Sequence, residues 1–251
     1  MDLGLKGRVA AVTGGTRGIG LAIAELLAAE GAHVAVCARS EAGVEAGRTR
    51  GWFAMNADVT REEDARRFID AAAAQWGRLD ILVNNVGGSL GGGTFTQSTV
   101  DQWRAVLDVN VMSTLYASKA AIPHMRSAGW GRIINIASVW GRESGGGSAY
   151  NAGKAAVISM SKSMAQDLAK DGILVNVVAP GSVWFPEGGW DKRMKVDPAK
   201  IEAFVESDMP LGRFGKPEEV ADVVALLASE RAGLVTGACW AVDGSQGKSN
   251  I

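Results

Sequence analysis

The chain has 251 residues, and its length, composition and charge already exclude several classes of protein. A chain of this length can bury one large core, and α/β domains of this size commonly stay single. Its 26 basic and 27 acidic residues give a net charge of -1, which indicates neither a nucleic acid nor an anionic membrane as a partner. No apolar run reaches the roughly 18 residues of a membrane helix, and the N-terminus lacks a signal-peptide core, so we expect a cytoplasmic protein.

Cysteine and histidine are too few to indicate a disulfide framework or a metal cluster. Cys37 and Cys239 lie in segments expected to be strands, which predicts buried thiols rather than a disulfide. His33 and His124 each stand alone, so no metal site is predicted.

Strand-like and helical segments alternate along the chain. Strands are expected around Val9, Val34, Phe53, Ile81, Ile133, Val175 and Ala241, and helices around Ile23, Ala65, Val106, Val157 and Val224. This alternation predicts an α/β fold over residues 1–251, a single-domain, doubly wound (Rossmann-type) parallel sheet with helices on both faces. Thr60 and Glu63 have the spacing of a capping box, and Pro217 with two acidic residues after it is typical of a helix start.

A glycine-rich loop follows the first expected strand. It reads Thr-Gly-Gly-Thr-Arg-Gly-Ile-Gly and leads into a helix that ends near Ala29. Gly14, Gly18 and Gly20 permit a tight turn, close approach of the backbone to a pyrophosphate, and close packing of helix on strand. A glycine run alone can be a simple turn, and its GxxxGxG spacing differs from GxGxxG. Its place between a strand and a helix favours dinucleotide binding.

Tyr150 and Lys154 lie four residues apart in a segment expected to be helical, which puts both on one face. An ammonium beside a phenol stabilises the phenolate and lowers a pKa that is ordinarily about 10. Tyr150 could then exchange protons with an alcohol or ketone near neutral pH. This spacing alone more often belongs to an ordinary half-exposed helix pair.

One irregular segment, residues 182–212, separates the last two expected strands. It is rich in tryptophan, phenylalanine and methionine, which disfavours disorder. Long loops of this kind in compact domains are usually functional. We therefore expect a lid over the substrate, with a short helix over residues 198–207.

Four further motifs follow strands or lie in a helix at ordered positions. They are Asn84-Asn85-Val86-Gly87, Asn110, Ser138, and Pro180-Gly181. Together with the glycine-rich loop and the Tyr150–Lys154 pair, they make the chain resemble the short-chain dehydrogenase/reductase family over essentially its whole length. The similarity is strong to the 3-oxoacyl carrier-protein reductases.

Polar groups that follow parallel strands should line one crevice, where Ser138 could bind a substrate carbonyl and Tyr150 could protonate it as hydride arrives. The resemblance implies that Lys154 also binds the nicotinamide ribose and that Asn110 anchors a water linking Lys154 to solvent. It implies cofactor contacts from Gly14, Thr16, Arg17, Gly18, Ile19, Gly20, Arg39, Ser40, Asp58, Val59, Asn85, Val86, Gly87, Tyr150, Lys154, Pro180, Gly181 and Val183.

The end of the second expected strand indicates the cofactor. An acid there would bind a ribose 2′-hydroxyl, whereas arginine accommodates a 2′-phosphate. The family's acid position is Ala38 here, followed by Arg39 and Ser40, with Arg17 in the glycine-rich loop. NADP is predicted over NAD. Asp58 and Val59 resemble the family's pair that frames the adenine, where Asp58 would bind the adenine amino group. Without that resemblance, a simple strand-end Asp before a helix is an equally good interpretation.

Two departures from the family pattern affect the expected ligands. Many members carry a threonine that helps hold the nicotinamide carboxamide, where this chain has Phe185. Either the Val183 backbone and other groups suffice, or cofactor affinity is reduced. Positions where the carrier-protein reductases present arginines read Gly129 and Asp171, which favours a free, partly apolar ketone or alcohol facing Trp140 and the lid.

The predicted function is an NADP-preferring oxidoreductase that transfers hydride between a nicotinamide cofactor and a ketone or secondary alcohol. The alternative is a non-catalytic NADP-binding sensor or scaffold of the same fold. A sugar-nucleotide epimerase usually needs a larger substrate domain and GxxGxxG spacing, and enoyl reductases of related fold place their lysine further from the tyrosine. Apolar helices at residues 100–125 and 150–170 predict a homotetramer, with a dimer as the fallback.

Overall fold

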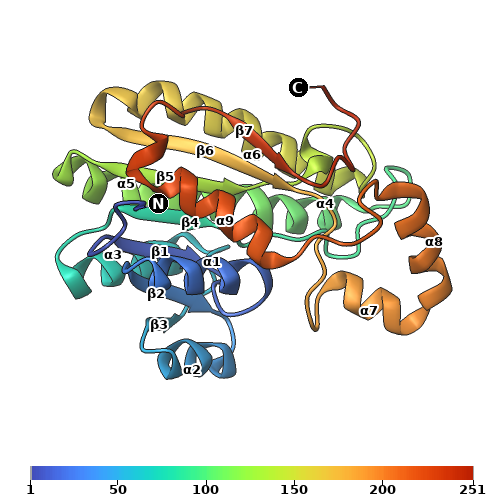
Figure 1. Cartoon of the computed structure of the whole chain (residues 1–251), viewed down its shortest axis with the longest axis horizontal. Helices are drawn as coiled ribbons and strands as arrows, with labels where there is room; N and C mark the ends of the chain where they lie inside the picture. The colour runs from blue at the N-terminus through green and yellow to red at the C-terminus, as the bar shows by residue number, and fades with distance from the viewer. Residues whose placement is uncertain (1, 251) are drawn as a thin grey trace.

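The computed structural model describes residues 2–250, and within them seven parallel strands form one sheet in the order β3-β2-β1-β4-β5-β6-β7 (Figure 1). The strands are β1 (Val9–Thr13), β2 (His33–Ala38), β3 (Phe53–Asn56), β4 (Ile81–Asn84), β5 (Gly131–Ile136), β6 (Ile173–Pro180) and β7 (Cys239–Val242). All seven expected strands are confirmed, and so is the doubly wound α/β fold.

Helices cover both faces of this sheet. They are α1 (Gly18–Ala29), α2 (Glu41–Thr49), α3 (Glu62–Trp76), α4 (Val100–Leu107), α5 (Ser113–Ala128), α6 (Ser148–Leu168), α7 (Gly189–Val196), α8 (Pro198–Asp208) and α9 (Pro217–Ala228). A π-helical turn at Asp108–Met112 joins α4 to α5. The helix α2 was not predicted.

The alternation of side chains along each strand sets the two layers of the core. Ala10 and Val12 of β1 point to the face covered by α1 and α9, while Val9 and Ala11 point to the face covered by α3, α5 and α6. Figure 1 shows α1 and α9 side by side along the sheet. Burial on both faces explains why the strands read as continuous apolar runs.

A buried polar network ties the helices to the carboxyl ends of the central strands. Asn84 Nδ2 donates to Asn135 Oδ1 at 2.8 Å and to Ser118 Oγ at 2.9 Å. Asn135 Nδ2 in turn donates to Ser161 Oγ at 2.8 Å. Because unpaired polar groups are costly in a core, this network fixes α5 and α6 against β4 and β5.

The predicted capping box of Thr60 and Glu63 is wrong. The helix α3 begins at Glu62, and Thr60 donates both its N–H (3.1 Å) and its hydroxyl (2.8 Å) to Asp58 Oδ1. The Asp58 N–H donates to Asp64 Oδ2 at 3.1 Å. A carboxylate two residues upstream therefore outcompetes the helix end for the threonine hydroxyl.

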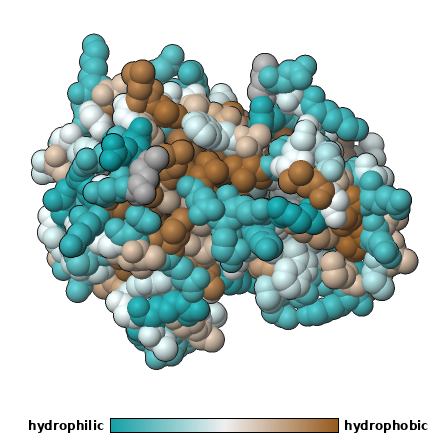
Figure 2. Space-filling model, in the orientation of Figure 1, coloured by the Kyte–Doolittle hydropathy of each residue, from teal (hydrophilic) through white to brown (hydrophobic). Residues whose placement is uncertain are grey.

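The segment at residues 182–212 holds two helices rather than one. The expected helix is present as α8, capped by Asp197, whose Oδ1 accepts from Lys200 N at 3.1 Å, and α7 precedes it unpredicted. Trp190 stacks on Phe204 with ring centroids 4.7 Å apart and contacts Phe214 at 5.0 Å. Figure 2 shows this segment as a lobe beside the rest of the molecule.

Both cysteines are free thiols, as predicted, with Cys37 buried and Cys239 half-buried. Burial raises the pKa of Cys37 to about 12, so this thiol is inert. Among the described residues, no helix combines the length and the apolarity that crossing a membrane requires.

Phe68 is the largest fully buried side chain of α3. Its replacement tests how tightly α3 packs on the sheet. We expect Phe68→Ala to lower the free energy of unfolding by about 3–5 kcal/mol, because the lost contacts leave a cavity between α3 and the sheet. Guanidinium unfolding followed by circular dichroism measures this. Arg66→Ala, an exposed change on the same helix, is the control, and a loss below about 1 kcal/mol for Phe68→Ala would show that the face is loosely packed.

Candidate active site

The carboxyl ends of β1, β4, β5 and β6 bring the predicted site residues to one edge of the sheet. The glycine-rich loop follows β1, Asn85 follows β4, Ser138 lies just beyond β5, and Pro180 ends β6. Asn84, the last residue of β4, pairs with Asn135, one residue before the end of β5. In doubly wound sheets this edge is where ligands bind.

The structure brings Ser138, Tyr150 and Lys154 together. The helix α6 places Tyr150 and Lys154 one turn apart, with Lys154 Nζ 5.8 Å from the centroid of the tyrosine ring. The side chains of Ser138 and Tyr150 are hydrogen-bonded to each other. Lys154 is buried, and its Nζ donates to the carbonyl of Ile136 at 2.8 Å.

Ionisation of this trio differs from the prediction. Burial raises the pKa of Tyr150 above its ordinary value, and the hydrogen bond with Ser138 opposes that rise. Burial also lowers the pKa of Lys154 from 10.5 to about 8. The pKa of Tyr150 is therefore raised on balance rather than lowered as expected, because desolvation outweighs any effect of the ammonium, which donates to Ile136 in this structure.

A glycine makes room for the lysine. A side chain on Gly87 would place its Cβ 2.7 Å from both Lys154 Nζ and Asn110 Oδ1. Asn110 lies in the π-helical turn and is fully buried. Its Nδ2 donates to Val106 O at 2.8 Å and to Gly88 O at 2.9 Å, and its Oδ1 accepts from Gly88 N at 3.1 Å. Asn110 thus fixes the loop that passes over the ammonium.

The glycine-rich loop is fastened to the end of β4. Gly14 and Gly18 have φ of 63° and 54°, the left-handed region that favours glycine. Asn85 Nδ2 donates to the carbonyls of Thr13 (3.0 Å) and Gly14 (3.2 Å), and a Cβ on Gly20 would collide with this amide. Within residues 2–250, no side chain caps α1 at Arg17, which leaves its first N–H groups available to an anion.

The predicted ribose end lies where β2 meets α2. Arg17 and Arg39 are both exposed at this end. Ser40 Oγ caps α2 by accepting from Gly43 N at 3.2 Å, and a Cβ on Gly43 would lie 3.1 Å from Thr16 Oγ1. The hydroxyls of Thr16 and Ser40 therefore both lie beside Gly43, and the exposed Arg17 and Arg39 are their neighbours in the chain, a donor set that suits a phosphate.

The segment at residues 182–212 reaches the glycine-rich loop through Phe185. A Cβ on Gly18 would lie 2.7 Å from Phe185 Cε2, so the ring packs directly on the loop backbone. Val183 pairs with Gly215 in an isolated β-bridge that joins the two ends of the segment. Sequence motifs do not identify Gln246, whose side chain hydrogen-bonds both the backbone N–H and the hydroxyl of Ser182.

Sequence comparisons agree with this geometry. A family profile described as "Enoyl-(Acyl carrier protein) reductase" matches residues 14–245. The chain is 38% identical to cis-4-hydroxycyclohexanecarboxylate dehydrogenase from Sinomonas cyclohexanicum, covering 94% of this chain and 95% of that protein. It is 39% identical to a 3-oxoacyl-[acyl-carrier-protein] reductase from Vibrio cholerae, covering 96% and 98%.

The chain belongs to the short-chain dehydrogenase/reductase family. Its fold matches the crystal structure of L-sorbose reductase from Gluconobacter frateurii, complexed with NADPH and L-sorbose, with a TM-score of 0.92. That match has 32% sequence identity and covers 99% of this chain and all of the other. The chain is thus an oxidoreductase of dehydrogenase/reductase type, and the predicted family is confirmed.

The packing of Gly87 against Lys154 and Asn110 can be tested directly. We expect Gly87→Ala to keep the fold but to lower kcat/KM by one to two orders of magnitude, because the new methyl group displaces the ammonium. Gly88→Ala is the matched control, since a Cβ there meets nothing within 4 Å. Equal activity of the two variants would show that the position of Lys154 tolerates this displacement.

Proposed function

We propose that this protein is an NADP-preferring carbonyl reductase or alcohol dehydrogenase acting on a ketone or secondary alcohol. The observation that carries the proposal is the hydrogen-bonded Ser138–Tyr150 pair beside the buried Lys154 ammonium. An acid, an orienting hydroxyl and a cation meet at the sheet edge that also presents the glycine-rich loop. Following NADPH absorbance across a panel of ketones tests the activity.

In this mechanism Ser138 and Tyr150 hold the carbonyl oxygen through their hydroxyl groups. The glycine-rich loop would hold the nicotinamide cofactor, which when bound would supply the hydride. Tyr150 gives its proton to the oxygen, and the Lys154 cation stabilises the phenolate that remains. Because the pKa of Lys154 is about 8, its charge is present at neutral pH and is lost as the pH rises above that value. The proposed role of Asn110 is to support Lys154 through an anchored water.

Preference for NADP rests on the ribose end of the site. Ala38 offers no carboxylate to a ribose hydroxyl, and the exposed guanidinium groups of Arg17 and Arg39 suit a 2′-phosphate. The related L-sorbose reductase was crystallised with NADPH. We propose that the residues predicted from the family motif form the cofactor site, with Asp58 and Val59 at the adenine.

The substrate we propose is a free, partly apolar ketone or alcohol. Gly129 ends α5 in the left-handed conformation, and Asp171 is paired with Arg126 at 2.7 Å, so neither position offers an acidic carrier protein an unpaired cation. Trp140 packs against Gly145 and Gly146 beside Ser138 and supplies an aromatic wall. One relative is named as a dehydrogenase of a hydroxycyclohexanecarboxylate, and this name supports a small cyclic alcohol or ketone as the substrate.

A non-catalytic NADP-binding sensor or scaffold is the weaker alternative. Such a protein has no need of an acid, and Tyr150 and Lys154 are both present and placed together. We further propose one catalytic domain with residues 182–212 as its lid, working in the cytoplasm.

Replacement of Tyr150 tests the acid. We expect Tyr150→Phe to reduce kcat by at least about a hundredfold and to leave NADP binding nearly intact, because the ring still packs but cannot donate a proton. Lys154→Ala should instead weaken NADP binding and raise the apparent pKa of the residual activity. Steady-state kinetics and calorimetric titration measure both. A Tyr150→Phe enzyme that keeps more than about a tenth of its activity would remove Tyr150 from the acid role.

The cofactor preference should be reversible, because specificity is a difference between two affinities. Ala38→Asp adds an acceptor for the ribose hydroxyl and a repulsive charge, while Arg39→Ala removes a charge-assisted phosphate contact worth roughly 1.5–3 kcal/mol. The double variant should prefer NADH in kcat/KM. A wild-type enzyme that already prefers NADH tenfold refutes the assignment, whereas a double variant that does not shift would move the phosphate site to Arg17.

We propose a homotetramer. The edge strand β7 exposes Trp240 (37%), and the nearby turn exposes Leu234 (98%), while Figure 2 shows hydrophobic surface across the middle of the face near α9. Association through α5 and α6 and through β7 would cover these faces. Light scattering at micromolar concentration should give four times the mass of one chain, and a monomeric mass would rule the assembly out.

A further inference from the structure

The C-terminal tail reaches back to the start of the lid through one buried glutamine. Gln246 is only 6% exposed although it lies five residues from the end of the chain. Its Oε1 accepts from Ser182 N at 2.7 Å, and its Nε2 donates to Ser182 Oγ at 3.0 Å. Both polar atoms of one amide side chain are therefore committed to a single residue of the lid.

A tight turn holds Gln246 in this position. Asp243 Oδ1 accepts from Ser245 N at 3.0 Å, and Asp243 Oδ2 accepts from Gly247 N at 2.9 Å. Ser245 has a φ of 67°, which is uncommon for a residue other than glycine. Such a conformation persists only where its surroundings fix it, so the turn is a rigid support for the glutamine.

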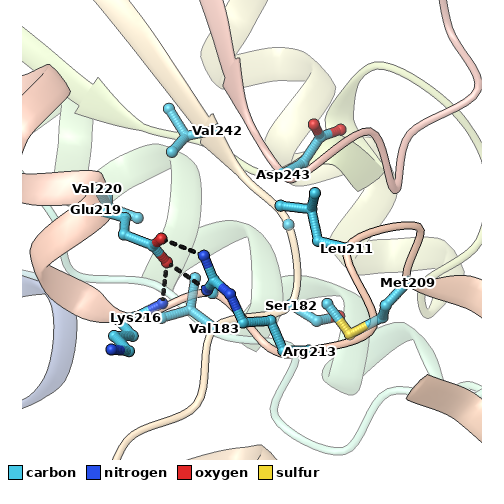
Figure 3. Close-up of a pocket in the computed structure, with 13 residues that line it drawn as sticks. Ser182, Val183, Met209, Leu211, Arg213, Lys216, Glu219, Val220, Val242 and Asp243 are labelled. Atoms are coloured by element: carbon cyan, nitrogen blue, oxygen red, sulfur yellow. Dashed lines mark hydrogen bonds and ion pairs between the residues drawn. The ribbon is translucent and has the colours of Figure 1, made fainter. Parts of the chain in front are cut away.

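Ser182 is the point from which the lid departs. It follows Pro180-Gly181, and its carbonyl accepts from Gly215 N at 2.9 Å, while Trp184 N donates to Gly215 O at 3.0 Å. These bonds join the outgoing and returning ends of the lid at one place. Figure 3 shows Ser182 and Val183 next to the returning chain, where Arg213 pairs with Glu219.

The space around Gly181 shows how closely the tail approaches. A Cβ on Gly181 would lie 2.7 Å from Gln246 Oε1 and 2.9 Å from Asp243 Cα. The glycine of the Pro-Gly motif thus admits the glutamine side chain. Without Gln246, the Ser182 N–H would be buried without its acceptor, and this penalty would favour rearrangement of the lid's first residues.

We propose that Gln246 is a positioning residue that fixes the Ser182–Val183 backbone for the nicotinamide end of the cofactor. Phe185 stands where many relatives use a threonine hydroxyl, so that end of the site depends on how the Val183 backbone is held. Gln246 fixes this backbone from the tail through its hydrogen bonds with Ser182. The Val183–Gly215 bridge fixes it from the returning chain. The proposal rests on the proposed NADP-dependent function.

The test compares Gln246→Leu with wild type in the full chain. We expect the dissociation constant for NADP⁺ and the KM for NADPH to rise about tenfold, while kcat at saturating NADPH changes less than about threefold, because the reacting groups are intact. Trypsin should cut the lid within α7, which carries Lys192, Arg193 and Lys195, about tenfold faster in the absence of cofactor.

Lys248→Ala is the control, since this side chain is exposed in the same tail and the change keeps the backbone. It should match wild type in all three measurements. If Gln246→Leu does not fold, Ser182→Ala serves in its place, because it removes the hydroxyl contact and keeps the backbone bond. We expect it to raise the dissociation constant about threefold.

A folded Gln246→Leu protein with affinity, KM and cleavage rate within twofold of wild type overturns the proposal. So does a tenfold effect of Lys248→Ala, which would mean that the tail acts without its glutamine. Failure of the proposed function gives a different result, since wild type itself would then fail to bind NADP⁺ or would reduce no ketone. The trypsin comparison needs no cofactor and still decides whether Gln246 holds the lid.

Discussion

The buried ammonium of Lys154 is the constraint around which the candidate active site is arranged. Removing a cation from water is expensive unless it is hydrogen-bonded, and the carbonyl of Ile136 at the end of β5 supplies that bond at 2.8 Å. Two glycines make the burial possible. A Cβ on Gly87 would press on the ammonium, and a Cβ on Gly141 would lie 2.7 Å from the backbone of Lys154. The packing of α6 against the sheet therefore fixes both neighbouring loops.

Stability and function make opposite demands on this lysine. Its folded pKa of about 8 lies below its unfolded value of 10.5, so the unfolded chain binds more protons between these two values. Burial of Lys154 therefore costs stability at neutral pH, and that cost disappears as the pH rises from about 8 through 10.5. The proposed mechanism needs the charged form, which exists where the cost is highest. The buried polar network of Asn84 and Asn135 offsets part of it by fixing the adjoining strands.

The sequence predicts the parts of this molecule that depend on local pattern. Apolar runs located all seven strands, and the four-residue spacing of Tyr150 and Lys154 correctly put them on one face of α6. The predictions fail where a distant or competing group determines a hydrogen bond or a pKa. The Thr60 hydroxyl donates to Asp58 instead of capping α3. Desolvation raises the pKa of Tyr150 despite the neighbouring lysine. Gln246 and Ser182 are 64 residues apart in the sequence, and no short motif predicts their contact.

Isotope labelling shows whether hydride passes from the nicotinamide to the substrate carbonyl. NADPH carrying deuterium at the transferring position of its nicotinamide would be incubated with the enzyme and any ketone that the absorbance screen identifies. Mass spectrometry and NMR of the alcohol would then locate the label. We expect one deuterium on the carbinol carbon, with the hydroxyl proton coming from Tyr150 and solvent. A product whose carbinol hydrogen comes from solvent, or a folded protein that binds NADPH and reduces no ketone in the panel, would contradict this expectation.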